Sequence, residues 1–113
     1  GHEDDAADFR NLLVKAVQAE GVDTGVWQGW PVPQMTVFQA KNGYGGGCPW
    51  SCGQSAPVDY SLEQYPVARR HSDWHTGMTF PLRYPNGTEL VDGVAEAFLK
   101  VLGHADALVE VAG

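Results

Sequence analysis

Two cysteines and two histidines form the sharpest chemical pattern in this sequence. Cys48 and Cys52 are separated by three residues, and so are His71 and His75. Residues at i and i+4 share one face of a helix, so both imidazoles could bind one ion, and the four side chains together imitate a Cys2His2 zinc site. The 18 residues between Cys52 and His71 exceed the usual spacing of a zinc finger. A Cys48–Cys52 disulfide with two surface histidines remains the alternative interpretation.

The four tryptophans are a second chemical feature. Trp27 and Trp30 lie, together with two glutamines, on a segment that prolines stiffen. Aromatic faces stack on the C–H faces of sugars, and amides satisfy hydroxyl groups, so this segment suits a sugar or another polyol. Alternatively, the tryptophans cover the sheet or an interface with another domain.

No residue of this sequence is predicted to be catalytic. The glycine-rich stretch at 43–47 has no clear strand before it and helix after it, which favours a flexible loop over a phosphate site. Neither a Ser-His-Asp arrangement nor a carboxylate pair can be argued from the spacing. Lys15, Lys41 and Lys100 lie in polar contexts that would not desolvate an amine for covalent chemistry.

Charge and composition limit the partners of this chain. Its 14 acidic residues outnumber 7 basic ones and give a net charge of −7, which repels phosphate backbones, so we expect no nucleic-acid partner. No apolar run of about 18 residues is present, so we expect no membrane association. Two cysteines do not make a disulfide scaffold, which makes a cytoplasmic setting the expectation.

The length of 113 residues suits one domain over 1–113. Residues 1–3 have the form of a tag remnant, and residues 27–60 are rich in glycine and proline, which predicts a long loop region.

A first helix is predicted upstream of Gly21, which is expected to end it in a left-handed conformation. Its apolar stripe has helical spacing, whereas Arg10 faces the other way. Asp4 or Asp5 could cap its start. The stripe comprises Phe9, Leu12, Leu13, Ala16 and Val17.

Two strands and two further helices complete the expected order. Alternation predicts strands at 22–26 and 78–84, and Pro66 is well placed as the first residue of a helix that runs to about Trp74. Thr88 could cap the last helix. The expected buried stripe of that helix comprises Leu90, Val94, Phe98, Val101, Leu102 and Ala105.

This order predicts an α/β fold, a small two-layer sandwich with about three helices packed on a short sheet. Two strands are marginal as a sheet in water, which suggests that a strand is missing.

The order of motifs resembles the C-terminal segment of DegT/StrS-type sugar aminotransferases. Residues 8–22 are similar to the helix that opens this segment in the family, and residues 24–38 to the strand and substrate-side loop that follow. Residues 48–50 and 65–68 resemble the later part, in which a proline opens a helix. The strand at 78–82 and the final helix complete the order, and the likeness covers nearly the whole chain.

The resemblance implies the small C-terminal domain of a fold type I enzyme that uses pyridoxal 5′-phosphate and is usually a homodimer. Such enzymes transfer an amino group, commonly from glutamate or glutamine, to a keto-sugar or cyclitol. The cofactor lysine belongs to the larger N-terminal domain, which is the expected partner, so this chain alone is expected to bind no cofactor and to be inactive. Many members have a histidine where this chain has Pro33, so that role is not carried over. Trp30, Gln34 and Met35 are the expected substrate-lining residues.

The first interpretation is therefore a substrate-side domain or fragment of such an aminotransferase, in natural-product amino-sugar biosynthesis. One alternative is a small zinc-stabilised binding module that uses the two cysteines and two histidines. Another is a stand-alone protein-interaction domain whose tryptophan loop docks a partner.

Overall fold

The computed structural model describes residues 2–44, 46–53, 56–78 and 83–112. The chain divides into two compact units. The terminal unit comprises Gly1–Trp27 and Trp74–Gly113, and the central unit comprises Gln28–Asp73.

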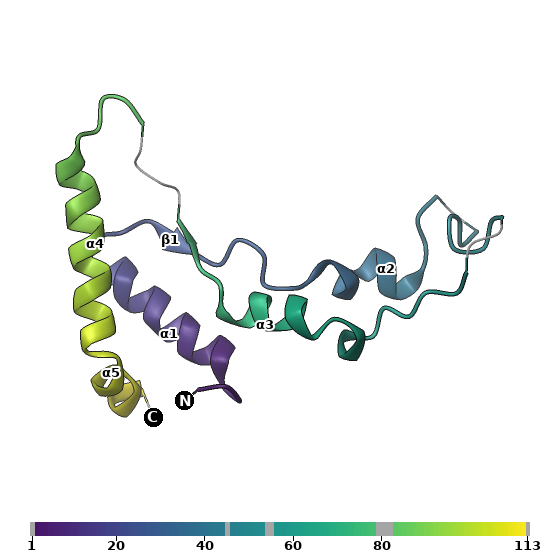
Figure 1. Ribbon diagram of the computed structural model, residues 1–113, viewed down its shortest axis with the longest axis horizontal. Coiled ribbons are helices and arrows are strands. Elements are labelled where there is room, and N and C mark those ends of the chain that lie inside the picture. The colour runs from purple at the N-terminus through teal and green to yellow at the C-terminus, as the bar shows by residue number, and fades with distance from the viewer. Residues whose placement is uncertain (1, 45, 54–55, 79–82, 113) are drawn as a thin grey trace. The chain divides into compact units, whose positions relative to one another are not determined.

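Helices dominate the terminal unit. Helix α1 (Ala6–Ala19) packs against α4 (Thr88–Gly103) and α5 (Ala105–Ala112), and it also contacts strand β1 (Thr24–Gly25). Figure 1 shows α1 beside α4, with α5 at the C-terminal end of α4. Among the described residues, the buried hydrophobic side chains all belong to this helical contact: Ala6, Val17, Ala97 and Val101.

Helix α1 follows the predicted stripe only in part. Val17 is buried, and the other four residues of the stripe are half-buried. Arg10, expected on the outer face, is buried instead, and its guanidinium donates two hydrogen bonds to the Asn11 side chain. Asp5 precedes the helix, but its side chain forms no capping hydrogen bond. Gly21 adopts the expected left-handed conformation with φ of 91°.

A short sheet joins the two sequence segments that make up the terminal unit. Strand β1 pairs antiparallel with β2 (Gly77–Met78), so that Thr24 lies opposite Met78 and Gly25 opposite Gly77. The first strand is thus shorter than the predicted 22–26. Of the predicted strand at 78–84, residues 79–82 lie outside the described residues.

Helix α4 begins at Thr88, but Thr88 is not its cap, because Gly87 occupies that position. Two residues of the predicted stripe, Leu90 and Leu102, are exposed, and Ala97 is buried in their place. Helix α5 was not predicted from the sequence. It follows a break in helical geometry at His104, and it contacts α1.

In the described part of the central unit there are four short elements. They are the 3-10 turn η1 (Val32–Gln34), helix α2 (Thr36–Ala40), the 3-10 turn η2 (Leu62–Gln64) and helix α3 (Pro66–Trp74). The start of α3 at Pro66 and its end at Trp74 agree with the sequence analysis. Helix α2 lies within the predicted loop region 27–60. It has only five residues and ends at Lys41, whose φ of 50° is left-handed.

The observed architecture is a mixed, helix-rich arrangement with a small two-stranded antiparallel sheet. At this level it agrees with the predicted α/β class. None of the helices in the described part of the chain is long and apolar enough to cross a membrane.

Candidate functional site

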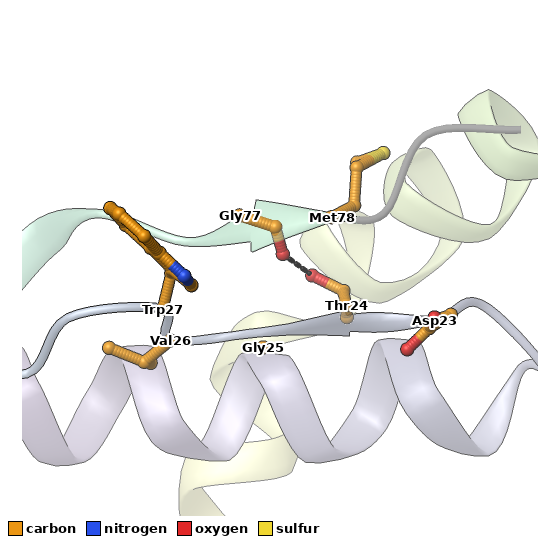
Figure 2. A pocket seen from close by; sticks show the side chains of 7 residues that line it. All are labelled: Asp23, Thr24, Gly25, Val26, Trp27, Gly77 and Met78. Atoms are coloured by element: carbon orange, nitrogen blue, oxygen red, sulfur yellow. Dashed lines mark hydrogen bonds between the residues drawn. The ribbon is translucent and has the colours of Figure 1, made fainter. Parts of the chain in front are cut away.

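A hollow of about 420 Å³ lies beside the sheet of the terminal unit (Figure 2). It is lined by residues of and around β1 and by both residues of β2: Asp23, Thr24, Gly25, Val26, Trp27, Gly77 and Met78. Thr24 is buried, and its hydroxyl donates to the Gly77 carbonyl oxygen at 2.8 Å. This bond holds the two strands together beneath the hollow.

Two glycines that line the hollow face each other across the sheet. A methyl group added at Gly25 would meet no atom within 4 Å, and one at Gly77 would meet only the Gly25 carbonyl oxygen at 3.9 Å. A methyl group at either position would therefore fit without a clash. Bare backbone in a strand often marks a place where another group approaches closely.

The two ends of this hollow differ in chemistry. Figure 2 shows the Trp27 indole at one end and the Asp23 carboxylate at the other. The Trp27 side chain is 89 % exposed, and Asp23 is exposed as well. A flat indole face and a carboxylate acceptor suit a polyhydroxylated ring, because its C–H face can stack while its hydroxyls donate.

Asp23 and Gly25 are not among the site residues that the sequence predicts. The signal that could have found them is the alternation of the strand, which places every second residue on one side of the chain. Asp23, Gly25 and Trp27 share this spacing, with glycine in the middle.

The predicted substrate-lining residues lie in the central unit, around η1. Trp30 precedes η1 and is 68 % exposed, and Gln34 is its last residue and is also exposed. Met35 is half-buried and precedes α2, where its carbonyl oxygen accepts the backbone N–H groups of Phe38 and Gln39. These three residues lie close together because they are neighbours in the sequence. Their role in binding stays a prediction.

The two cysteines of the proposed zinc site are joined. Cys48 and Cys52 form a disulfide, with Cα atoms 5.2 Å apart. Sulfurs in a disulfide are not thiolates, so they do not act as zinc ligands in this state. His71 lies on α3, whereas His75 follows the end of this helix instead of sharing its face. Among the described residues, no group of three or more His, Cys, Asp or Glu side chains could hold a metal ion. The Cys2His2 site therefore stays a hypothesis for the reduced chain.

Three aromatic side chains of the central unit contact one another, and we call Phe38, Trp50 and Tyr60 the aromatic cluster. Trp50 lies within the disulfide-bonded segment. The indole N–H of Trp50 donates to the Tyr60 hydroxyl at 2.8 Å. Trp50 meets Phe38 and Tyr60 edge to face, with ring centroids 6.1 and 6.3 Å apart. The centroids of Phe38 and Tyr60 are 5.3 Å apart. Edge-to-face pairs at these distances are favourable contacts.

Asp59 forms a turn next to this cluster. The backbone N–H of Ser61 donates to Asp59 Oδ1 at 2.8 Å. This bond, helped by the Ser61 hydroxyl and by the positive charge of Lys41, holds the pKa of Asp59 below its ordinary value.

The lysines do not offer a site for pyridoxal phosphate. Lys41 Nζ donates to the Val58 carbonyl oxygen at 2.9 Å, and Lys100 Nζ donates to both carboxylate oxygens of Glu20 at 2.8 Å. Lys15 is exposed on α1. A lysine that forms a covalent link with this cofactor needs a desolvated or otherwise activated amine. Lys41 and Lys100 are engaged in these hydrogen bonds and Lys15 is exposed, so these three amines do not fit a covalent link to the cofactor.

Comparisons with protein-family models, curated proteins and solved structures find no match to this chain. The resemblance to DegT/StrS-type aminotransferases therefore rests on the residues and on the order of elements alone.

Proposed function

We propose that this chain is the substrate-side C-terminal domain of a pyridoxal-phosphate-dependent aminotransferase. The enzyme would act on a keto-sugar or cyclitol in cytoplasmic natural-product amino-sugar biosynthesis. In this proposal the chain folds as a two-layer sandwich when it packs against an N-terminal domain that binds the cofactor. The parent enzyme is a homodimer.

The observation that supports this proposal most is the imbalance between buried and exposed apolar side chains. In the part of the chain that the structure describes, the buried hydrophobic residues are small or medium-sized, and Val17 is the largest one that is fully buried. Large aromatic and aliphatic residues lie outside: Trp27, Trp30, Val32, Val37, Tyr44, Val58, Val67, Trp74, Tyr84, Leu90, Leu99, Leu102 and Val111. These side chains occur in both units, and covering part of them with a partner would remove apolar surface from water.

The short sheet supports the same proposal. A two-stranded sheet is marginal in water, and further strands or a packed layer are usually needed to stabilise it. Within the described residues, β1 and β2 form a sheet of only two strands. A larger domain that supplies such a layer would stabilise this sheet.

The substrate class is supported by the exposed indoles. Trp27 borders the hollow of the terminal unit, and Trp30 lies beside Gln34 in the central unit. Both suit a polyhydroxylated ring that stacks on carbon and hydrogen-bonds through its hydroxyls. The chain would contribute substrate contacts and exclude water, while the partner domain supplies the reactive amine.

The full natural reading frame tests this proposal. Its product should bind pyridoxal phosphate, and borohydride reduction followed by peptide mapping should locate the modified lysine outside residues 1–113. In that enzyme Trp30→Ala should raise KM for the sugar by at least about threefold, because a stacking contact is lost. Glu96→Ala is the control, since Glu96 is exposed and does not belong to the exposed apolar set that is proposed to pack against the partner.

Two results would contradict the proposal. One is a modified lysine within residues 1–113. The other is a combination of two findings. The natural reading frame encodes no cofactor domain, and no separately encoded cofactor domain of the same organism binds this chain.

The stand-alone interaction domain is the second candidate, because the same exposed side chains could meet a separately encoded protein. The two candidates differ in the partner. If the natural partner of this chain carries no pyridoxal phosphate, the interaction domain is the better description.

A further inference from the structure

The disulfide of the central unit is placed where a reductant can reach it. It closes a segment of five residues, in which Cys48 is half-buried and Cys52 is exposed. A thiolate attacks a disulfide through one accessible sulfur, so exposure on one side is sufficient. Disulfides in cytoplasmic proteins, when present, are usually transient or sense redox conditions.

The bridged segment carries Trp50, the one tryptophan of this chain that is not exposed. Its indole donates to Tyr60 and packs edge to face on both other members of the aromatic cluster. The disulfide restricts the backbone on either side of Trp50. Opening it would increase the conformational freedom of this segment and weaken the contacts of the indole.

The aromatic cluster is connected to the predicted substrate-lining stretch. The side-chain amide of Gln39, next to Phe38, donates to the Pro33 carbonyl oxygen at 2.7 Å and to the Tyr60 carbonyl oxygen at 3.0 Å. Pro33 lies in η1, directly before Gln34. One amide therefore links η1 to the segment that holds Tyr60.

Little else stabilises this region. Every buried hydrophobic residue in the described parts of the chain belongs to the terminal unit. The central unit, as far as it is described, relies instead on the aromatic cluster, hydrogen bonds and the disulfide. Regions with few buried apolar contacts open locally at low free energy.

We propose that the Cys48–Cys52 disulfide is a redox switch. A dithiol reductant opens it, releases Trp50 from the aromatic cluster and loosens the stretch around η1, while the helices of the terminal unit stay folded. Regulation of substrate binding at Trp30, Gln34 and Met35 by this opening rests on the proposed function. The local structural change itself does not depend on the proposed function.

The chemistry is a two-step thiol–disulfide exchange. A thiolate of the dithiol attacks the sulfur of Cys52, forms a mixed disulfide and expels the Cys48 thiolate. The second thiol of the reductant then displaces Cys52 and closes its own disulfide. Two electrons pass from the dithiol to the cystine, and the two protons of the dithiol end on the thiols of Cys48 and Cys52.

Nuclear magnetic resonance of the 15N-labelled 113-residue chain tests the switch. The indole N–H signal of Trp50 is assigned by its loss in Trp50→Phe. Dithiothreitol is the reductant, and mass spectrometry after alkylation confirms two new thiols. On reduction, the Trp50 signal should move toward its position in urea, and its hydrogen exchange should accelerate by about tenfold or more. Amide exchange at Val17 and Val101 should change less than about twofold, because their unit stays folded.

Two variants make the result specific. Cys48→Ser with Cys52→Ser should show the Trp50 signal of the reduced chain both with and without dithiothreitol. Tyr60→Phe keeps the ring but removes the hydroxyl that accepts the Trp50 indole N–H. It should accelerate indole exchange while the disulfide remains intact.

Three outcomes would overturn the switch. They are an unchanged Trp50 signal after confirmed reduction, a parallel loss of protection at Val17 and Val101, and a chain that retains free thiols in an oxidising glutathione buffer. None of these measurements involves aminotransferase activity, so the switch and the proposed function can fail independently.

Discussion

The hydroxyl of Thr24 donates a hydrogen bond of 2.8 Å to the carbonyl oxygen of Gly77, 53 residues later in the chain. It also lies 3.1 Å from the Thr76 hydroxyl, which donates to the Gly25 carbonyl oxygen at 3.1 Å. These side-chain bonds support the pairing of β1 with β2. Because Thr24 is buried, its hydroxyl is satisfied by these protein partners.

We expect Thr24→Val to destabilise the terminal unit by about 1 kcal/mol, because the shape is retained while a buried hydrogen bond is lost. Thr24→Ser is the comparison variant: it retains the hydroxyl but removes a buried methyl group, so about 0.8 kcal/mol of any loss is assigned to the methyl group. Urea unfolding followed by circular dichroism measures both. An unfolding midpoint of Thr24→Val equal to that of the unsubstituted chain would show that the hydroxyl contributes nothing.

The contact of α1 with α4 and α5 gives a second prediction. Val17 is 2 % exposed, whereas Val111 is 89 % exposed. Val17→Ala should lower the free energy of unfolding by about 1.5–3 kcal/mol, as expected for a buried aliphatic side chain. Val111→Ala makes the same chemical change at the surface and should alter it by less than about 0.5 kcal/mol. Similar losses for the two variants would contradict the burial of Val17.

Helix positions were the most predictable part of this fold. The apolar spacing of residues 9–17 predicts α1, and Gly21 ends it as expected. Pro66 likewise predicts the first residue of α3. These features depend on neighbours in sequence, so local chemistry determines them.

Long-range contacts were less predictable. The burial of Arg10 depends on what packs against α1, and the exposure of Leu90 and Leu102 depends on which face of α4 meets α1. Periodicity indicates a stripe but not its partner, so it overestimated the width of the buried face. Helix α2 was missed because five residues among glycines and prolines carry too little periodicity.

In the candidate site, too, local features were predictable and long-range contacts were not. The tryptophans are visible in the sequence, but the hollow that Asp23 and Trp27 line also has lining residues from the partner strand, which pairs Gly77 with Gly25. No local pattern relates these two glycines. The sequence analysis left zinc ligation and a disulfide open for Cys48 and Cys52, because spacing alone does not fix the positions of two sulfurs.

Gly43 gives a third prediction. A methyl group there would lie 2.8 Å from the Cys48 carbonyl oxygen, which accepts the Tyr44 backbone N–H at 3.0 Å. Gly43→Ala should therefore shift this turn and destabilise the central unit by roughly 1–3 kcal/mol. Gly29→Ala is the matched control, since a methyl group at Gly29 meets no atom within 4 Å. Hydrogen exchange of the Trp50 indole reports on the unit, and equal exchange in the two variants would refute the predicted clash.

The Asp59 turn gives the fourth prediction, which concerns pH. Hydrogen bonds from Ser61 lower the pKa of Asp59 in the folded chain, whereas the unfolded chain has an ordinary aspartate. A lowered folded pKa means that the carboxylate stabilises the turn above the ordinary pKa, about 3.9. This stabilisation is lost as the pH falls from there through the lower, folded value.

Carbon NMR of the Asp59 carboxyl group measures this directly. Its titration midpoint should lie below that of the same carbon in urea. Ser61→Ala should move the midpoint upward, because the hydroxyl contribution is lost, but only part of the way, because the backbone N–H of residue 61 still donates. Asp59→Asn should remove the dependence of the turn on pH in this range. A midpoint equal to that in urea would mean that the hydrogen bond from Ser61 does not persist in solution.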